Sequence, residues 1–116
     1  MELIMDALTK KHCKPCEGGV PPLPSDEIQK LLKELSGWEL LENGKSIVRH
    51  FQFSNYYKTM AFVNAVAWMA NQEDHHLDLE VSYNFCRVKY ITHAVGGLSE
   101  NDFICAAKVN ALIQVN

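Results

Sequence analysis

Three of the five histidines of this sequence lie between residues 73 and 102. His75 and His76 are adjacent within Glu-Asp-His-His, and His93 stands shortly before a Gly-Gly pair. An unperturbed imidazole has a pKa of about 6.5, so it can both donate and accept a proton near neutral pH. The cluster therefore indicates either proton-transfer chemistry or a metal site.

The spacing of these histidines favours one of the two. Three histidines, or two histidines and an aspartate, can bind zinc, but adjacent residues such as His75 and His76 point in different directions unless the backbone turns sharply. The sequence has no His-x-His or His-x-x-x-His pair. It also lacks a glycine-rich phosphate loop, a Gly-x-Ser-x-Gly motif and a cysteine beside a clustered histidine. Metal-free acid–base chemistry on a bound heterocycle is favoured.

Two neighbouring strands are expected to bring the three histidines together. Apolar and polar residues alternate over 79–83 and again over 86–90, with a short turn near Asn84 between them. In an antiparallel pair the first strand begins where the second ends, so the histidines gather at the open end of this hairpin. All three imidazoles are then within reach of one small molecule.

Two aspartates accompany the histidines. Asp102 is separated from His93 by the Gly-Gly turn, so it is expected at the same end of the sheet. Each aspartate also has a purely structural interpretation, because Asp74 at a helix end could be a solvated residue and Asp102 could only cap its own helix.

Capping residues and one turn place the remaining elements. Three helices are expected to begin at Ser25, at Ser54 and at Ser99-Glu100-Asn101-Asp102, which has the spacing of a capping arrangement. A β-hairpin is expected around Asn43-Gly44, the pair typical of a type I′ turn. The resulting order is α-β-β-α-β-β-α, which predicts an α+β fold with one four-stranded antiparallel sheet and helices packed on one face.

Composition sets the class of protein. The chain has 116 residues, of which 47% are apolar and 22% charged, and fits one domain. That domain is expected over 25–116, after a leader at 1–24 that ends in turn formers and prolines. The net charge of -3 offers no basic surface for direct nucleic-acid binding. No uncharged run approaches the roughly 20 apolar residues of a membrane span, and acids stand where a secretory signal carries bases, so a cytoplasmic location is expected.

The four cysteines are of two kinds. Cys86 and Cys105 fall inside a strand pattern and a helix pattern and are expected to be buried free thiols. His12, Cys13 and Cys16 could bind zinc or undergo redox cycling, but no second ligand pair follows and no βαβ context surrounds them. A surface segment without a catalytic role is the favoured interpretation of this leader.

Longer stretches of the sequence resemble a known family. Glu73-Asp74-His75-His76, the strand end Tyr90-Ile91-Thr92-His93 and the run Gly96-Gly97-Leu98-Ser99-Glu100-Asn101-Asp102 are similar to the signature of pterin-4a-carbinolamine dehydratases. The resemblance extends upstream through Gly37-Trp38 and covers roughly 25–112. It implies the same fold, a homodimer or homotetramer, and no metal or organic cofactor.

The resemblance also implies a reaction. The substrate would be the 4a-hydroxytetrahydropterin released by an aromatic amino-acid hydroxylase, and loss of water would give the quinonoid dihydropterin for recycling to tetrahydrobiopterin. By the resemblance, His75 and His93 correspond to the acid–base histidines and His76 to a histidine that orients the pterin. The predicted catalytic and substrate-binding residues are Asp74, His75, His76, Leu77, Thr92, His93 and Asp102.

Two departures and two rival functions remain. The family usually has proline where this chain has Leu77, and some members have glutamate where it has Asn71, which puts loop rigidity and rate in question. A binding module of the same fold would use the histidines only to hold a pterin or a protein partner. A zinc hydrolase would use all three as ligands.

Overall fold

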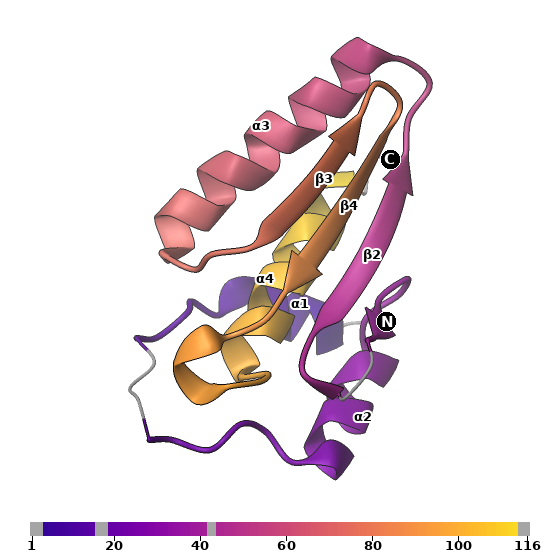
Figure 1. Ribbon diagram of the computed structural model, residues 1–116. Coiled ribbons are helices and arrows are strands. Elements are labelled where there is room, and N and C mark those ends of the chain that lie inside the picture. The colour runs from indigo at the N-terminus through magenta and orange to yellow at the C-terminus, as the bar shows by residue number, and fades with distance from the viewer. Residues whose placement is uncertain (1–3, 16–18, 42–43, 114–116) are drawn as a thin grey trace.

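Four antiparallel strands form one sheet, and the helices pack against one of its faces (Figure 1). The computed structural model describes residues 4–15, 19–41 and 44–113. The strands are β1 (Glu39–Leu40), β2 (Ile47–Gln52), β3 (Asp78–Ser82) and β4 (Phe85–Tyr90), in the spatial order β1-β2-β4-β3. The predicted α+β class and its sheet are confirmed.

Four helices and a short 3₁₀ turn are present in the part of the chain described. They are α1 (Ile4–Lys10), α2 (Ser25–Lys33), α3 (Tyr56–Glu73), η2 (His93–Val95) and α4 (Glu100–Ile113). From Ser25 onward the order of elements is the predicted one, and α1 is an addition within the leader. In Figure 1, α4 crosses behind the sheet with α1 beside it, and α3 runs along the β3 side.

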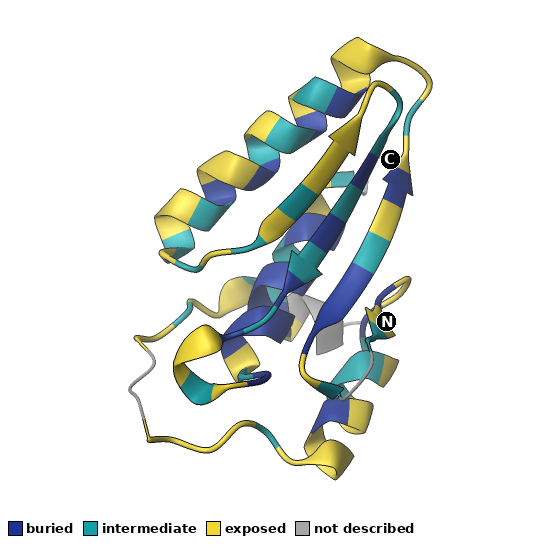
Figure 2. Cartoon of the chain, viewed as in Figure 1, coloured by how far each residue is buried: buried dark blue, intermediate teal, exposed yellow. Residues whose placement is uncertain are grey.

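The register of the strands decides which side chains enter the core. Phe51 pairs with Cys86 and Ile47 with Tyr90, so these four side chains share the face towards the helices. All four are at most 4% exposed. They meet α4, in which residues 101–107, 109 and 110 are buried and which is largely dark blue behind the sheet in Figure 2. Burial of one large apolar side chain contributes about 1.5–3 kcal/mol, so this layer contributes several kcal/mol to the stability of the fold.

Two capping predictions are wrong by one residue. Pro24, not Ser25, is the N-cap of α2; it is extended and its carbonyl accepts the Ile28 N–H at 3.0 Å, while no side chain caps the helix. Asn55, not Ser54, caps α3, and its Oδ1 accepts the Lys58 N–H at 2.9 Å. Serine and asparagine cap equally well, so residue type could not decide between Ser54 and Asn55. At α2 residue type favours Ser25, but Ser25 is already helical and Pro24 precedes the helix without a side-chain cap.

The first hairpin has the expected register. Leu40 pairs with Ile47 and the Leu41 N–H donates to the Ser46 carbonyl, which centres the connection on 43–44. Gly44 has φ +65°, the left-handed conformation that glycine adopts without a steric penalty. Asn43 lies outside the described residues, so the turn type remains a prediction.

A buried amide ties the first hairpin to α4. Asn110 Oδ1 accepts hydrogen bonds from Trp38 Nε1 at 2.9 Å and from an Arg49 guanidinium nitrogen at 2.7 Å. Asn110 Nδ2 donates to the Ser36 carbonyl at 3.1 Å. Gly37 lies under the Arg49 side chain, where a Cβ would come within 2.5 Å of Nε. The polar groups of the Gly37-Trp38 corner are therefore satisfied inside the core.

The leader packs on the domain. Leu8 of α1 is 3% exposed and belongs to the hydrophobic core that α4 completes. The Lys108 ammonium of α4 donates to the Thr9 carbonyl at 2.7 Å. Residues 4–15 of the expected surface segment are therefore packed on the domain. Cys86 and Cys105 are buried free thiols, as predicted, whereas Cys16 lies outside the described residues.

Candidate active site

A residue in the left-handed conformation separates α3 from the two adjacent histidines. Asp74, the C-cap, has φ 52° and ψ 46°, and the His75 N–H behind it donates to the Ala70 carbonyl at 3.3 Å. This is the sharp turn that adjacent histidines need if both are to serve one site. His75 then turns inward, and His76 stays exposed.

His75 is fixed by two contacts. Its Nε2 lies 2.7 Å from Asp102 Oδ1, and its ring stacks on Tyr90 with centroids 5.8 Å apart and planes at 11°. The His75 side chain is 9% exposed and that of Asp102 is fully buried. The pair joins the end of α3 to the first turn of α4, so the imidazole cannot rotate without breaking a buried hydrogen bond.

Asp102 receives three donors. Besides His75, the Thr92 hydroxyl donates to Oδ2 at 2.7 Å and the Ser99 N–H donates to Oδ2 at 3.0 Å. Thr92 gives its one proton to Asp102, so the contact of 2.8 Å between the Thr92 and Ser99 hydroxyls has Ser99 as donor. The carboxylate only accepts, which assigns an N–H of His75 to Nε2; in the neutral ring Nδ1 is then the acceptor. Asp102 therefore caps its helix and also orients His75.

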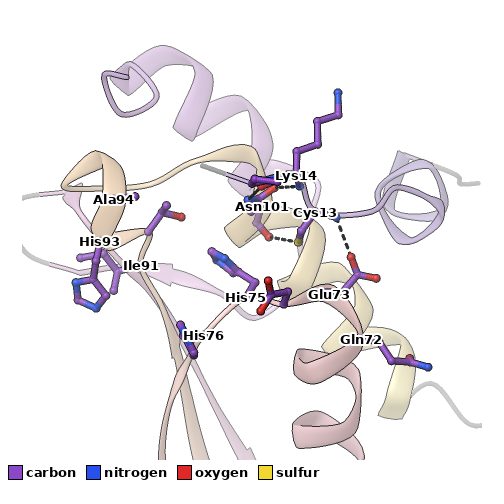
Figure 3. A pocket seen from close by; sticks show the side chains of 13 residues that line it. Cys13, Lys14, Gln72, Glu73, His75, His76, Ile91, His93, Ala94 and Asn101 are labelled. Atoms are coloured by element: carbon purple, nitrogen blue, oxygen red, sulfur yellow. Dashed lines mark hydrogen bonds between the residues drawn. The ribbon is translucent and has the colours of Figure 1, made fainter. Parts of the chain in front are cut away.

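The three histidines line one pocket of about 470 Å³, the size of a small-molecule site. Its lining comes from four segments, residues 13–15, 72–76, 91–94 and Asn101. Segments 72–76 and 91–94 meet because β3 begins beside the end of β4, where Asp78 pairs with Lys89. In Figure 3, His93 lies with Ile91 and Ala94 on one side, and His75 with Glu73 and the leader on the other. The convergence expected from the strand pairing is present.

Two predicted site residues lie elsewhere. Leu77 does not line the pocket; it immediately precedes β3 and packs against the hydrophobic core, as Leu79 does. Asp102 is also absent from the lining and stands behind His75. Asp74, Thr92 and the three histidines do line it, as expected of substrate contacts.

Other lining residues were not foreseen. Cys13, Lys14 and Pro15 come from the leader, and Asn101 is the neighbour of Asp102. No local pattern marks these leader residues, since they meet the site through contacts between segments far apart in the sequence. Asn101 could have been suspected from its place beside Asp102 at the start of α4.

Glu73 is the charged residue that links the leader to this site. Its carboxylate accepts the Cys13 N–H at 2.8 Å and His12 Nδ1 at 3.0 Å, and the Lys108 ammonium lies 3.6 Å away. Burial acts to raise the pKa of Glu73, but the Cys13 N–H, His12 and Lys108 together outweigh it and lower the pKa. Glu73 is thus held ionised with only 6% of its side chain exposed.

The described residues contain neither a candidate metal site nor a candidate membrane-spanning helix. No three or more histidine, cysteine, aspartate or glutamate side chains gather there in a way that could hold a metal ion. None of the helices in these ranges has the length and apolar character needed to cross a membrane.

A family model described as pterin 4 alpha carbinolamine dehydratase matches residues 21–112, which include all three histidines and Asp102. The chain belongs to this family. A dehydratase-family protein of Nitrosospira multiformis, provisionally named pterin-4-alpha-carbinolamine dehydratase, is 58% identical over 99% of this chain and its own full length. A relative from Nitrosomonas europaea with the same provisional name is 63% identical over 92% of this chain and 94% of its own.

Solved structures share the fold of the family. The crystal structure of a transcriptional coactivator/pterin dehydratase from Brucella melitensis superimposes with a TM-score of 0.76 at 31% identity, covering 78% of this chain and 97% of that one. A pterin dehydratase-like protein described as a RuBisCO assembly factor in the alpha-carboxysome has a TM-score of 0.60 at 20% identity, covering 69% of this chain and 93% of its own. That second likeness concerns the fold alone.

Proposed function

We propose that this protein is a 4a-hydroxytetrahydrobiopterin dehydratase, which removes water from the pterin carbinolamine to give quinonoid dihydropterin in tetrahydrobiopterin recycling. The observation that carries the proposal is the His75–Asp102 pair, 2.7 Å apart, beside a pocket that His76 and His93 also line. A base held by an orienting carboxylate is the arrangement that acid–base catalysis needs. Membership of the dehydratase family supports the same reaction.

The two proton transfers can be assigned to two histidines. In the proposed step His93 protonates the leaving hydroxyl at C4a, and the C4a–O bond breaks with release of water. An N–H proton of the pterin passes to Nδ1 of His75, whose Nε2 is held by Asp102, and the N–H bonding pair becomes the new double bond to C4a. One proton enters and one leaves, so no cofactor is needed.

Binding of the pterin falls to the exposed side of the pocket. His76 is exposed and lines the pocket, as does Asp74, so both can meet the donors and acceptors of the heterocycle. The Thr92 hydroxyl is committed to Asp102, so Thr92 acts on the reaction through that carboxylate. A homodimer or homotetramer is part of the proposal, and exposed Val81 and Tyr83 at the β3 edge suit such a contact.

The test is turnover by the purified protein. The proposal expects loss of 4a-hydroxytetrahydrobiopterin absorbance faster than its spontaneous decay, with no change after chelator treatment. Dihydropterin binding without any acceleration would favour a binding module, a role made relevant by the assembly factor that shares this fold. Stoichiometric metal together with inactivation by chelators would favour the zinc hydrolase instead.

A further inference from the structure

The leader contributes one wall of the pocket. Cys13, Lys14 and Pro15 line the same cavity as the three histidines, although the family match begins only at residue 21. We propose that the leader segment, defined as residues 11–15, closes the pterin pocket, and that Glu73 and Asn101 are the positioning residues that hold it there. The inference rests on the proposed function, because it concerns how that same site binds its substrate.

Glu73 is the first anchor. It accepts the backbone N–H of Cys13 through Oε1 and the His12 ring through Oε2, and Lys108 of α4 approaches the same oxygen. The Glu73 side chain is 6% exposed while that of His12 is 81% exposed, so the anchor is buried and its outer partner is at the surface. A charge-assisted hydrogen bond to a backbone N–H fixes the chain at this residue.

Asn101 is the second anchor. Its Oδ1 accepts the Lys14 N–H at 3.0 Å and its Nδ2 donates to the Lys14 carbonyl at 2.7 Å. One buried amide side chain, 7% exposed, therefore satisfies both backbone groups of one leader residue. Such reciprocal pairing defines the position and the direction of the segment, as a partner strand would do.

A thiol contact lies between the two anchors. Cys13 Sγ is 3.4 Å from Cys105 Sγ and 3.7 Å from the Asn101 carbonyl, and Cys105 is fully buried within α4. The pKa of the Cys13 thiol is raised, first by the hydrogen bond with Cys105 and second by burial. Cys13 is thus a neutral, partly buried side chain that packs on the core.

The anchors adjoin the catalytic pair. Glu73 is followed by Asp74 and His75, and Asn101 is followed by Asp102. The leader segment therefore rests on the two chain turns that define the His75–Asp102 geometry. In Figure 3 the Lys14 side chain is directed away from His75 and His76. The leader segment therefore borders the cavity with its backbone and with Cys13.

This placement predicts a role in binding more than in chemistry. A wall against a flat heterocycle adds contact area and excludes water in the ground state and in the transition state alike. Loss of such uniform binding raises KM and leaves kcat nearly unchanged. Removal of a catalytic acid or base instead lowers kcat and leaves KM nearly unchanged.

The kinetic test uses the full chain with Glu73→Ala and Asn101→Ala. We expect KM to rise about tenfold in each, equivalent to about 1.4 kcal/mol of binding, with kcat within about threefold of wild type. The matched control is Glu80→Ala, which removes the ion pair of 3.6 Å between Glu80 and Arg87, outside the leader segment and the pocket lining, and should leave both constants unchanged. Wild-type KM in both anchor variants would overturn the inference.

Hydrogen–deuterium exchange supplies a readout independent of turnover. The Cys13 and Lys14 amides donate to side chains, so the peptide carrying them should exchange slowly in wild type and more slowly still with 7,8-dihydrobiopterin. Both effects should be lost in the anchor variants. A protein that protects this peptide on binding but has no turnover would refute the proposed function alone. Turnover with a peptide that the pterin never protects would refute the leader wall alone.

Discussion

His75 Nε2 and Asp102 Oδ1 lie 2.7 Å apart, and this one hydrogen bond joins the C-terminal end of α3 to the first turn of α4. Asp102 is fully buried and holds two further donors, Thr92 and the Ser99 N–H. The strands bring the histidines to one end of the sheet, and Asp102 then decides the orientation and tautomer of the buried one.

Asp102→Asn should lower kcat by roughly 10²-fold or more, the scale of a positioned base that is held in the wrong tautomer. The amide has the same shape but can donate to Nε2, which would move the ring proton to Nδ1. Steady-state dehydration kinetics give the result. Thr92→Val, which keeps the carboxylate and removes one of its donors, should cost less. Equal kcat in Asp102→Asn and wild type would show that the pair is only structural.

Alanine substitutions should divide the histidines by role. His75→Ala and His93→Ala are each expected to lower kcat by about 10²-fold or more, and His76→Ala to act mainly on KM. His50→Ala is the matched control, because His50 is exposed and stacks on Phe85 at a centroid distance of 6.1 Å, outside the pocket lining. Wild-type kinetics in all three site variants would remove the proposed site.

Stability should depend on pH through Glu73. Its folded-state pKa is lowered from 4.5, so its ionised form stabilises the fold above that pH and the contribution is lost as pH falls through the folded value. The thermal midpoint of wild type should therefore exceed that of Glu73→Gln near neutral pH, and the difference should shrink below pH 4.5. A difference that stays constant down to acid pH would contradict the assigned ion pairs.

Asn110→Ala should destabilise the fold through the Gly37-Trp38 corner. The Trp38 N–H and the Arg49 guanidinium lose their shared acceptor inside the core, at a cost of about 2 kcal/mol. For a domain of this size that lowers the thermal midpoint by about 8 °C. Asn55→Ala, which removes only the cap of α3, should cost about half as much. Equal thermal midpoints of wild type and Asn110→Ala in calorimetry would show that the buried Asn110 amide does not stabilise the fold.

The parts of the fold that obey local rules were predictable. Alternation over 86–90, turn residues and capping residues predict the strands and helices from Ser25 onward, and antiparallel pairing is enough to bring His75, His76 and His93 to one pocket. The error at Ser54 arose because serine and asparagine cap equally well, and the error at Ser25 because α2 begins after a proline that provides no side-chain cap.

The leader's place could not be read from the sequence. Cys13 meets Glu73, Cys105 and the Asn101 carbonyl across long separations, and such pairings have no periodic signature. The dual role of Asp102 was left open for the same reason. Whether an aspartate only caps its helix or also holds a histidine depends on where the end of α3 lies in three dimensions.

The most direct test of the dehydratase assignment is the rate of 4a-hydroxytetrahydrobiopterin dehydration with wild type and with the double variant His75→Ala/His93→Ala, each measured against spontaneous decay. The wild-type protein should accelerate the reaction well above the spontaneous rate, and the double variant should bind 7,8-dihydrobiopterin while falling to that rate. Dehydration at the spontaneous rate by a folded, pterin-binding wild type, or full activity in the double variant, would contradict histidine-catalysed dehydration at this pocket.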